Sequence, residues 1–230
     1  MKKSAITDLV DGVVSGDRKA VAQAITLVES KKASDVALSE KLLESILTAA
    51  GSSIRIGISG SPGVGKSTFI ESIGQLMVKN GNKLAVLAVD PSSSISGGSI
   101  LGDKTRMEYL SRDEQVFIRP SPSGKNLGGV NRSTRESIAI VEAAGFNVIV
   151  VETVGVGQSQ TEVFDMTDIF VVLLSPGGGD QLQGIKRGII ELADIVVVNK
   201  SDGDLKSSSR NTVLDYKNAL KLLKPRTKNW

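Results

Sequence analysis

Residues 60–67 read GSPGVGKS, a glycine-rich stretch that ends in a lysine and a hydroxyl side chain. An aliphatic run from Ile54 to Ser59 precedes it, and a helical stretch from Lys66 to Asn80 follows, before Gly81 stops the helix. Strand, G-x-x-x-x-G-K-[ST] loop and helix in this order predict a phosphate-binding P-loop. The glycines let backbone N–H groups turn toward a phosphate, and the positive end of the helix dipole adds to the attraction.

The residue types in this loop also predict their roles. Lys66 is expected to neutralise the β and γ oxygens of a nucleotide, and the Ser67 hydroxyl to coordinate Mg²⁺. Lys66 therefore counts as a catalytic as well as a binding residue. The residues expected to cradle the nucleotide are Gly60, Ser61, Pro62, Gly63, Val64, Gly65, Lys66, Ser67 and Thr68.

Further aliphatic runs predict the remaining strands of a sheet. They are Lys83 to Val89, Asn147 to Glu152, Ile169 to Leu174 and Ile195 to Asn199, with a short one from Val116 to Arg119. Helical stretches separate most of them, which implies right-handed crossovers between parallel strands. The chain is 40% hydrophobic but only 3% aromatic, as suits strands buried on both faces. The predicted fold class is α/β: a doubly wound, mostly parallel sheet of the P-loop NTPase type with an N-terminal helical extension.

The last predicted strand ends in Asn199-Lys200-Ser201-Asp202, which has the form N-K-x-D. Asp202 can accept hydrogen bonds from guanine N1–H and from the exocyclic amine, and adenine presents neither donor there. The Lys200 stem can lie along the ring face, and Asn199 would tie this loop to the P-loop. Alone, such a tetrapeptide is usually a solvated charged turn, but its place after a buried strand downstream of a P-loop favours GTP over ATP.

Acidic residues follow two of the predicted strands. Asp90 comes after the second strand, Glu152 ends the strand that begins at Asn147, and Asp103 lies in the loop region after Asp90. Ligands of open α/β sheets bind beyond the carboxyl ends of the strands, and carboxylates are hard ligands that suit Mg²⁺. We expect one or two of these acids to contact Mg²⁺ directly or through water. The alternative roles are loop capping for Asp90 and Glu152, and simple solvation for Asp103.

Residues 152–155, ETVG, occupy the place where many GTPases carry D-x-x-G. The backbone N–H of Gly155 could therefore bond the γ-phosphate and release it after hydrolysis. Val156 stands where Ras-like proteins have their water-orienting glutamine, and Gln158 is a candidate substitute. Arg106 is an internal candidate for charge stabilisation, and without a glutamine in place we expect slow intrinsic turnover.

Composition excludes several other chemistries. The chain has neither cysteine nor histidine, so disulfides, thiolate sites and imidazole metal sites are ruled out. The net charge is +3, from 28 basic and 25 acidic residues without a basic block, so we expect no nucleic-acid binding. Because the N-terminus lacks a continuous apolar segment, we expect no signal peptide, no transmembrane helix and a soluble cytoplasmic protein.

The chain is expected to divide into three segments. Residues 1–50 predict short amphipathic helices, residues 51–204 a P-loop GTPase domain, and residues 205–230 a C-terminal helix from about Ser209 to Leu223. Asp17 is a plausible N-cap of the N-terminal segment. The apolar positions at helical spacing in that segment are Val21, Ile25, Val28, Leu38, Leu42, Leu43, Ile46 and Leu47.

With these residues assembled, the chain resembles the MeaB/ArgK family, a branch of the SIMIBI class of P-loop GTPases. Six motifs carry the resemblance and together span residues 54–202. They are GSPGVGKST at 60–68, VDPSS at 89–93, GDKTRM at 102–107, VETVGVGQS at 151–159, SPGGGDQLQGIK at 175–186 and NKSD at 199–202.

The resemblance implies a chaperone of adenosylcobalamin-dependent mutases, chiefly methylmalonyl-CoA mutase. Members of the family couple GTP binding and hydrolysis to delivery of intact cofactor and removal of damaged cofactor. By motif, Ser67, Asp90, Asp103 and Glu152 become the Mg²⁺ neighbourhood, with Lys66, Asp103 and Glu152 as the catalytic set.

The same resemblance assigns the loops of the predicted domain. The segments from Asp90 to Arg106 and from Glu152 to Thr161 look like two switches. Residues 177–186 look like a third switch that signals to the mutase, whereas their composition alone indicates only a flexible loop. The family forms homodimers through a C-terminal arm and has a second base-contacting loop. Neither is recognisable in this sequence, so a truncated form is expected.

Three other functions remain as alternatives. A metal-delivery GTPase for hydrogenase or urease shares the predicted fold but needs cysteine and histidine ligands. A partition-type or transport-linked P-loop ATPase or kinase conflicts with the N-K-x-D sequence. A scaffold with a vestigial nucleotide site conflicts with the presence of every phosphate and metal element.

Overall fold

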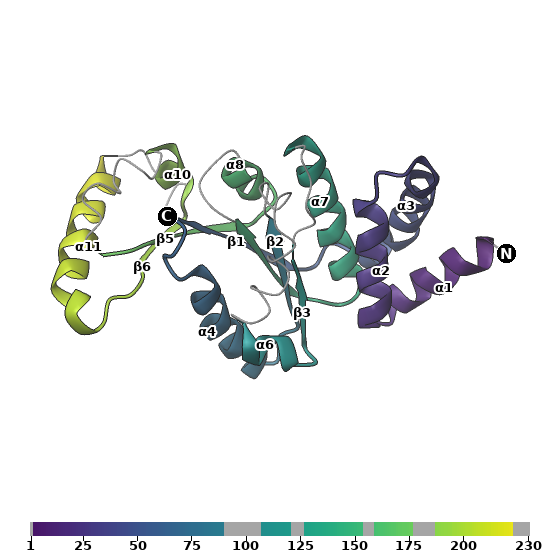
Figure 1. Cartoon of the computed structure of the whole chain (residues 1–230), viewed down its shortest axis with the longest axis horizontal. Helices are drawn as coiled ribbons and strands as arrows, with labels where there is room; N and C mark the ends of the chain where they lie inside the picture. The colour runs from purple at the N-terminus through teal and green to yellow at the C-terminus, as the bar shows by residue number, and fades with distance from the viewer. Residues whose placement is uncertain (1, 90–106, 121–126, 154–158, 177–186, 223–230) are drawn as a thin grey trace.

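The computed structural model describes residues 2–89, 107–120, 127–153, 159–176 and 187–222. Within these residues, six strands form one sheet in which every pair of neighbours is parallel, in the order β3-β2-β4-β1-β5-β6 (Figure 1). The strands are β1 (Ile54–Gly60), β2 (Leu84–Val89), β3 (Val116–Arg119), β4 (Val148–Thr153), β5 (Ile169–Leu174) and β6 (Ile195–Val198). The predicted α/β class and all six predicted strands are therefore confirmed, with ends displaced by at most one residue.

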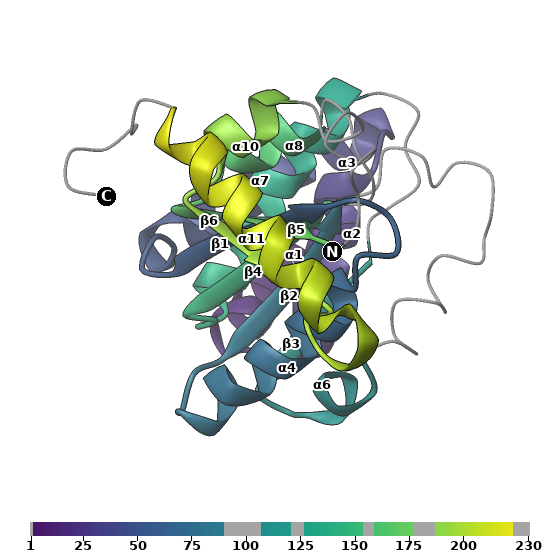
Figure 2. The same cartoon turned by 90° about the vertical axis from the view of Figure 1, so that its left-hand side faces the viewer.

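Helices cover both faces of the sheet (Figures 1 and 2). One face carries α4 (Lys66–Lys79) and α6 (Glu108–Arg112), and the other carries α7 (Leu127–Ala143), α8 (Ser159–Phe164) and α10 (Arg187–Leu192). Successive strand residues serve opposite faces: Val86 and Val150 pack with Ile70 under α4, whereas Leu87 and Val151 join the core on the α7 side. This two-sided burial explains why the strands are continuous aliphatic runs.

The N-terminal segment forms three helices that pack beside α7. They are α1 (Lys2–Val14), α2 (Arg18–Glu29) and α3 (Ala33–Ile46). The predicted N-cap is confirmed, because Asp17 Oδ1 accepts a hydrogen bond from Lys19 N at 2.9 Å. Val21 and Ile25 are fully buried in the core cluster that also contains residues of α7 and the sheet. The division at residues 50 and 204 stays a prediction.

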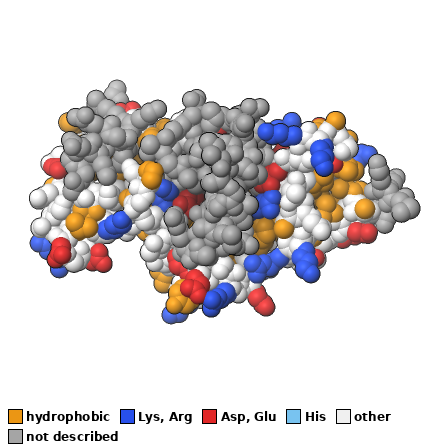
Figure 3. All heavy atoms as spheres, in the orientation of Figure 1, with side chains coloured by type: hydrophobic (Ala, Val, Ile, Leu, Met, Phe, Trp, Pro, Cys, Tyr) orange, Lys and Arg blue, Asp and Glu red, His pale blue; other side chains and the backbone are white. Residues whose placement is uncertain are grey.

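The C-terminal helix of the described residues is α11 (Lys206–Lys221), preceded by a short 3-10 turn, η2 (Gly203–Leu205). It lies beyond β6 and crosses in front of the sheet in Figure 2. Tyr216 anchors it in the core, whereas Val213 and Leu214 are half exposed. On the face drawn in Figure 3, acidic and basic side chains of the described residues are interspersed. Among these residues, no helix combines the length and the apolar character that crossing a membrane requires.

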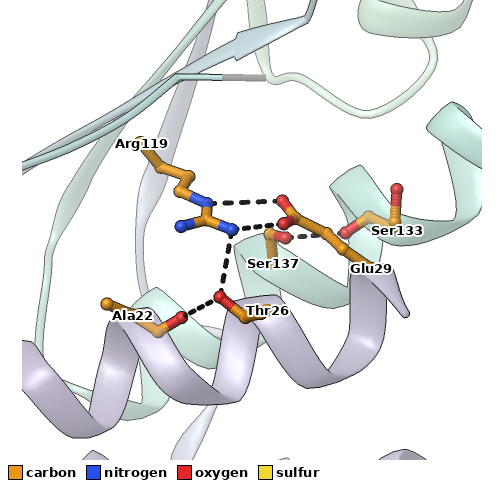
Figure 4. Close-up of polar contacts among 6 residues, drawn as sticks. All are labelled: Ala22, Thr26, Glu29, Arg119, Ser133 and Ser137. Atoms are coloured by element: carbon orange, nitrogen blue, oxygen red, sulfur yellow. Dashed lines mark hydrogen bonds and ion pairs between the residues drawn. The ribbon is translucent and has the colours of Figure 1, made fainter. Parts of the chain in front are cut away.

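A polar cluster joins the N-terminal helices to the edge of the sheet (Figure 4). Arg119, the last residue of β3, forms an ion pair with Glu29 at the end of α2, and its Nη2 also donates to Thr26 Oγ1 at 3.2 Å. The Glu29 side chain is only 9% exposed, and this burial raises its pKa, an effect that the Arg119 guanidinium partly offsets. The ion pair therefore holds α2 at the carboxyl end of an edge strand.

We predict that Glu29→Ala destabilises the protein by about 1–3 kcal/mol, because Arg119 would keep a largely buried charge without its carboxylate. The matched control is Arg112→Ala, which removes an ion pair to Glu108 whose side chains are 75% and 61% exposed. That control should cost no more than about 0.5 kcal/mol. Urea unfolding of the full chain measures both, and equal losses would contradict the anchoring role of Glu29.

Candidate nucleotide-binding site

The backbone between β1 and α4 has the shape that a phosphate cradle needs. Gly63 and Gly65 adopt left-handed conformations, with φ of 77° and 95°. The first hydrogen bond of α4 runs from Phe69 N to Gly65 O at 2.9 Å. The N–H groups of residues 66–68 therefore precede the helical ladder, as at any helix N-terminus, and can face an anion.

Lys66 is a buried cation at this helix terminus. Its residue is 8% exposed, and Nζ donates to Gly60 O at 2.8 Å and to Ser61 O at 3.4 Å. Burial lowers the pKa of the ammonium, while the negative charge of Glu152 raises it in part. A phosphate at this place would add a negative charge next to the buried Lys66 ammonium and so offset the cost of burying that charge.

Glu152 lies at the same edge of the sheet as the P-loop. It is 5% exposed in β4, where it pairs in register with Ile58 of β1 and Ala88 of β2. Ser67 is half buried in the first turn of α4. Asp90, Asp103 and Gly155 lie outside the described residues, as do Arg106 and Gln158. Within the described part of the chain, no cluster of three acidic residues forms a ready metal site.

The loop after β6 is bonded directly to the P-loop. Asn199 Nδ2 donates to Val64 O at 2.9 Å, which confirms the predicted contact between these loops. Lys200 Nζ donates to Gly63 O at 2.6 Å, a contact that the sequence did not predict. Lys200 has a φ of 53°, the only left-handed non-glycine residue among those described. The loops that follow β1 and β6, two strands that are not neighbours in the sheet, are thus joined by two hydrogen bonds.

Asp202 follows this contact by two residues. It is exposed, and its side chain makes no capping hydrogen bond to η2 although it stands at the N-cap position. Its backbone oxygen accepts from Leu205 N at 3.2 Å, so the turn itself is ordered by the main chain.

One group of buried polar residues near the site was not predicted from the sequence. The Ser59 hydroxyl accepts a hydrogen bond from Gln160 Nε2 at 2.7 Å and one from Thr153 Oγ1 at 3.0 Å. All three residues are at most 1% exposed. The only signal in the sequence was a serine within an aliphatic run, and serine is common enough in strands that it does not reveal its partners.

The family model described as "Methylmalonyl Co-A mutase-associated GTPase MeaB" matches residues 21–230. A "Putative GTPase" from Caulobacter vibrioides is 56% identical over 98% of this chain and 69% of its own length. The mouse protein "Methylmalonic aciduria type A homolog, mitochondrial" is 52% identical over 96% of this chain and 56% of its own length. "GTPase ArgK" from Escherichia coli is 48% identical over 100% of this chain and 70% of its own length.

Solved structures agree with the fold. The crystal structure described as "LAO/AO transport system kinase" superimposes with a TM-score of 0.83 at 40% identity, over 100% of this chain and 68% of that one. Signal recognition particle 54 kDa protein from Aeropyrum pernix, in complex with GDP, gives a TM-score of 0.54 at 14% identity, over 94% of this chain and 56% of that one. The second likeness shows the fold alone.

We predict that Gly65→Ala weakens both folding and nucleotide binding. A Cβ at Gly65 would lie 2.7 Å from Asn199 Nδ2, in addition to the strain of the left-handed backbone. The matched control is Gly81→Ala, since Gly81 has a φ of 84° and no atom within 4 Å of the added Cβ. We expect about 1–3 kcal/mol of extra destabilisation for Gly65→Ala over the control. GDP affinity should fall in Gly65→Ala alone, and equal unfolding and binding curves for the two variants would refute the contact.

Two observations settle the family of this chain. Most of its length matches one family model, and relatives that are about half identical to it run along nearly all of it. The structure adds a parallel sheet whose P-loop is bonded to an N-K-x-D loop. The chain belongs to the MeaB family of methylmalonyl-CoA mutase-associated P-loop GTPases.

Proposed function

We propose that this protein binds GTP with Mg²⁺ and hydrolyses it as the switch of a mutase chaperone. The proposed partner is an adenosylcobalamin-dependent acyl-CoA mutase, with methylmalonyl-CoA mutase as the first candidate. The observation that best supports binding of a guanine nucleotide is the pair of hydrogen bonds from Asn199 and Lys200 to the P-loop. The family description supports the mutase half.

In this proposal the described residues bind the nucleotide from two sides. The first turn of α4 and the Lys66 ammonium hold the phosphates, and Asp202 reads the guanine edge. Because Asn199 and Lys200 bond to the P-loop carbonyls, these bonds would fix the distance between the base reader and the phosphate cradle. Such preorganisation reduces the entropy lost on binding.

The proposed Mg²⁺ neighbourhood is Ser67, Asp90, Asp103 and Glu152. The donors are all oxygen, which suits Mg²⁺, and the carboxylate of Glu152 is buried. When bound there, Mg²⁺ would neutralise negative charge that develops on the phosphates. Asp103 and Glu152 are proposed to act with Lys66 in hydrolysis.

Loss of the γ-phosphate is proposed to change the face shown to the mutase. The backbone N–H of Gly155 would lose its acceptor. The segments 90–106 and 152–161, which the γ-phosphate and Mg²⁺ are proposed to hold, would both be released. Residues 177–186 are proposed to pass this change to the partner. Intrinsic turnover is expected to be slow, with Gln158 and Arg106 as candidate aids.

The remaining proposals concern the whole protein. The chain spans between about half and two thirds of its relatives' length, from 56% to 70% in those compared. Assembly into homodimers is carried over from the family resemblance as a proposal. Cytoplasmic action also stays a proposal, since the mouse relative is named mitochondrial.

A transport-linked kinase is the second candidate function, favoured by the description of one similar structure. The N-K-x-D loop weighs against it, because a carboxylate at position 202 would face an acceptor of adenine. Comparing the binding of fluorescent GDP and ADP separates the two functions.

We predict that Asp202→Asn moves base preference from guanine toward xanthine nucleotides. An asparagine amide can donate to the C2 oxygen of xanthine, whereas it opposes the exocyclic amine of guanine with a donor. GDP affinity should fall by at least about 100-fold while XDP affinity rises. Competition with fluorescent GDP measures both, and a GDP preference that survives the change would place the base reader elsewhere.

We predict that the protein recovers a cobalamin-dependent mutase from extracts of its native cell in a nucleotide-dependent way. The full chain is immobilised with either a non-hydrolysable GTP analogue or GDP, and the bound fraction is probed for mutases. Lys66→Ala is the control, since it should not load nucleotide and its recovery should not respond to either one. A mutase recovered equally in all arms, or no mutase at all, would contradict the proposed partner.

A further inference from the structure

A buried polar cluster lies directly beneath the P-loop, on the sheet face that α8 covers. It consists of Ser59 of β1, Thr153 of β4 and Gln160 of α8, joined by the two hydrogen bonds to Ser59 Oγ at 2.7 and 3.0 Å. We call these three residues the Ser59 cluster. Its members are at most 1% exposed, so breaking one bond would leave a buried donor without its acceptor.

The two partners of Ser59 stand on either side of one segment of the chain. Thr153 is the last residue of β4, and Gln160 is in the first turn of α8. Between them lie residues 154–159, of which 154–158 are outside the described residues. A single hydroxyl therefore ties both flanks of this segment to the same strand.

That strand also carries the phosphate loop. Ser59 precedes Gly60, whose carbonyl oxygen accepts the hydrogen bond from Lys66 Nζ at 2.8 Å. Ile58, the residue before Ser59, pairs in register with Glu152. The side chain of Ser59 thus bonds the flanks of segment 154–158, while its backbone neighbours contact Lys66 and Glu152.

A glycine in β1 allows α8 to pack close enough to this strand for the cluster to form. Gly57 lies two residues before Ser59 and so on the same face of the sheet. A Cβ at Gly57 would lie 2.7 Å from Phe170 Cδ2 and 3.1 Å from Val163 Cγ1 in α8. Close packing at Gly57 allows Gln160 to reach the Ser59 hydroxyl.

We propose that Ser59 is a positioning residue for GTP hydrolysis, acting through Thr153 and Gln160 without contacting the nucleotide. The inference rests on the proposed function, in which Glu152 and Gly155 serve Mg²⁺ and the γ-phosphate. GDP is held by the P-loop and by Asp202, whereas hydrolysis also needs the end of β4, which carries Glu152, in register with the P-loop. Small displacements of reacting groups lower rates steeply, so Ser59 should govern turnover more than GDP affinity.

The test uses Ser59→Ala in the full chain. We expect kcat for GTP hydrolysis to fall by about 10- to 100-fold. GDP affinity should stay within about threefold of the unaltered protein, and affinity for a non-hydrolysable GTP analogue should fall relative to GDP. Thr153→Val, which keeps the branched shape and removes only the hydroxyl, should act in the same direction with a smaller effect.

Ser137→Ala is the matched control. Ser137 is also a buried serine, 5% exposed, but its Oγ donates to Ser133 O within α7, as Figure 4 shows. A general loss of packing or of a buried hydrogen bond would lower the thermal midpoint in both variants. Only the loss of the Ser59 cluster should change kcat and the ratio of analogue to GDP affinity.

The outcomes separate this inference from the proposed function. If the unaltered protein hydrolyses GTP and Ser59→Ala retains its kcat and its affinity ratio, the positioning role is wrong and the GTPase proposal stands. An equal loss of GDP and analogue affinity would also overturn it, because Ser59 would then serve the P-loop alone. If Ser59→Ala does not fold, Thr153→Val decides the question by the same two measurements. Absence of GTP hydrolysis in the unaltered protein would instead refute the proposed function.

Discussion

The candidate site depends on the parallel alignment of the strand ends. β1 lies between β4 and β5, so the last residues of the three strands, Gly60, Thr153 and Leu174, lie at one edge of the sheet. An antiparallel neighbour on either side would send its carboxyl end to the opposite edge and remove one side of the site. Parallel pairing needs crossover helices, and α4 supplies both a crossover and a helix N-terminus that could face an anion. The same element thus satisfies the fold and builds the cradle.

Hydrogen bonds between loops convert this alignment into a defined geometry. Strand ends place residues near each other but leave the loops free to adopt several conformations. Asn199 and Lys200 remove that freedom on one side of the P-loop by bonding to its carbonyl oxygens, and the Ser59 hydroxyl does the same beneath it. The glycines are needed for the same reason, since a Cβ at Gly65 would occupy the space of the Asn199 amide.

Three charged side chains that the described part of the chain buries have partners of opposite charge or polar acceptors. Lys66 has carbonyl acceptors and the charge of Glu152 nearby, and Glu29 has Arg119. Glu142, with a side chain only 2% exposed, pairs with Arg55 at 2.8 Å at the start of β1. The pairs of Glu29 and Glu142 join separate helices to the sheet, whereas Lys66 alone is surrounded by elements suited to an external anion. Charge therefore distinguishes the binding site from the structural contacts of the same fold.

The sequence by itself determined the strands, the P-loop and the N-K-x-D loop, because each depends on a local pattern. Aliphatic runs mark strands buried on both faces, and glycine spacing before a lysine marks a backbone that turns around an anion. The contact of Asn199 with the P-loop could be predicted because the N-K-x-D pattern follows a buried strand downstream of a P-loop, and parallel strands bring their carboxyl ends to one edge of the sheet. The bond of Lys200 to Gly63, the Ser59 cluster and the ion pair of Glu29 with Arg119 could not be predicted in this way. Each joins residues about 90 or more positions apart, and only the packing of helices onto the sheet brings such residues within hydrogen-bonding distance.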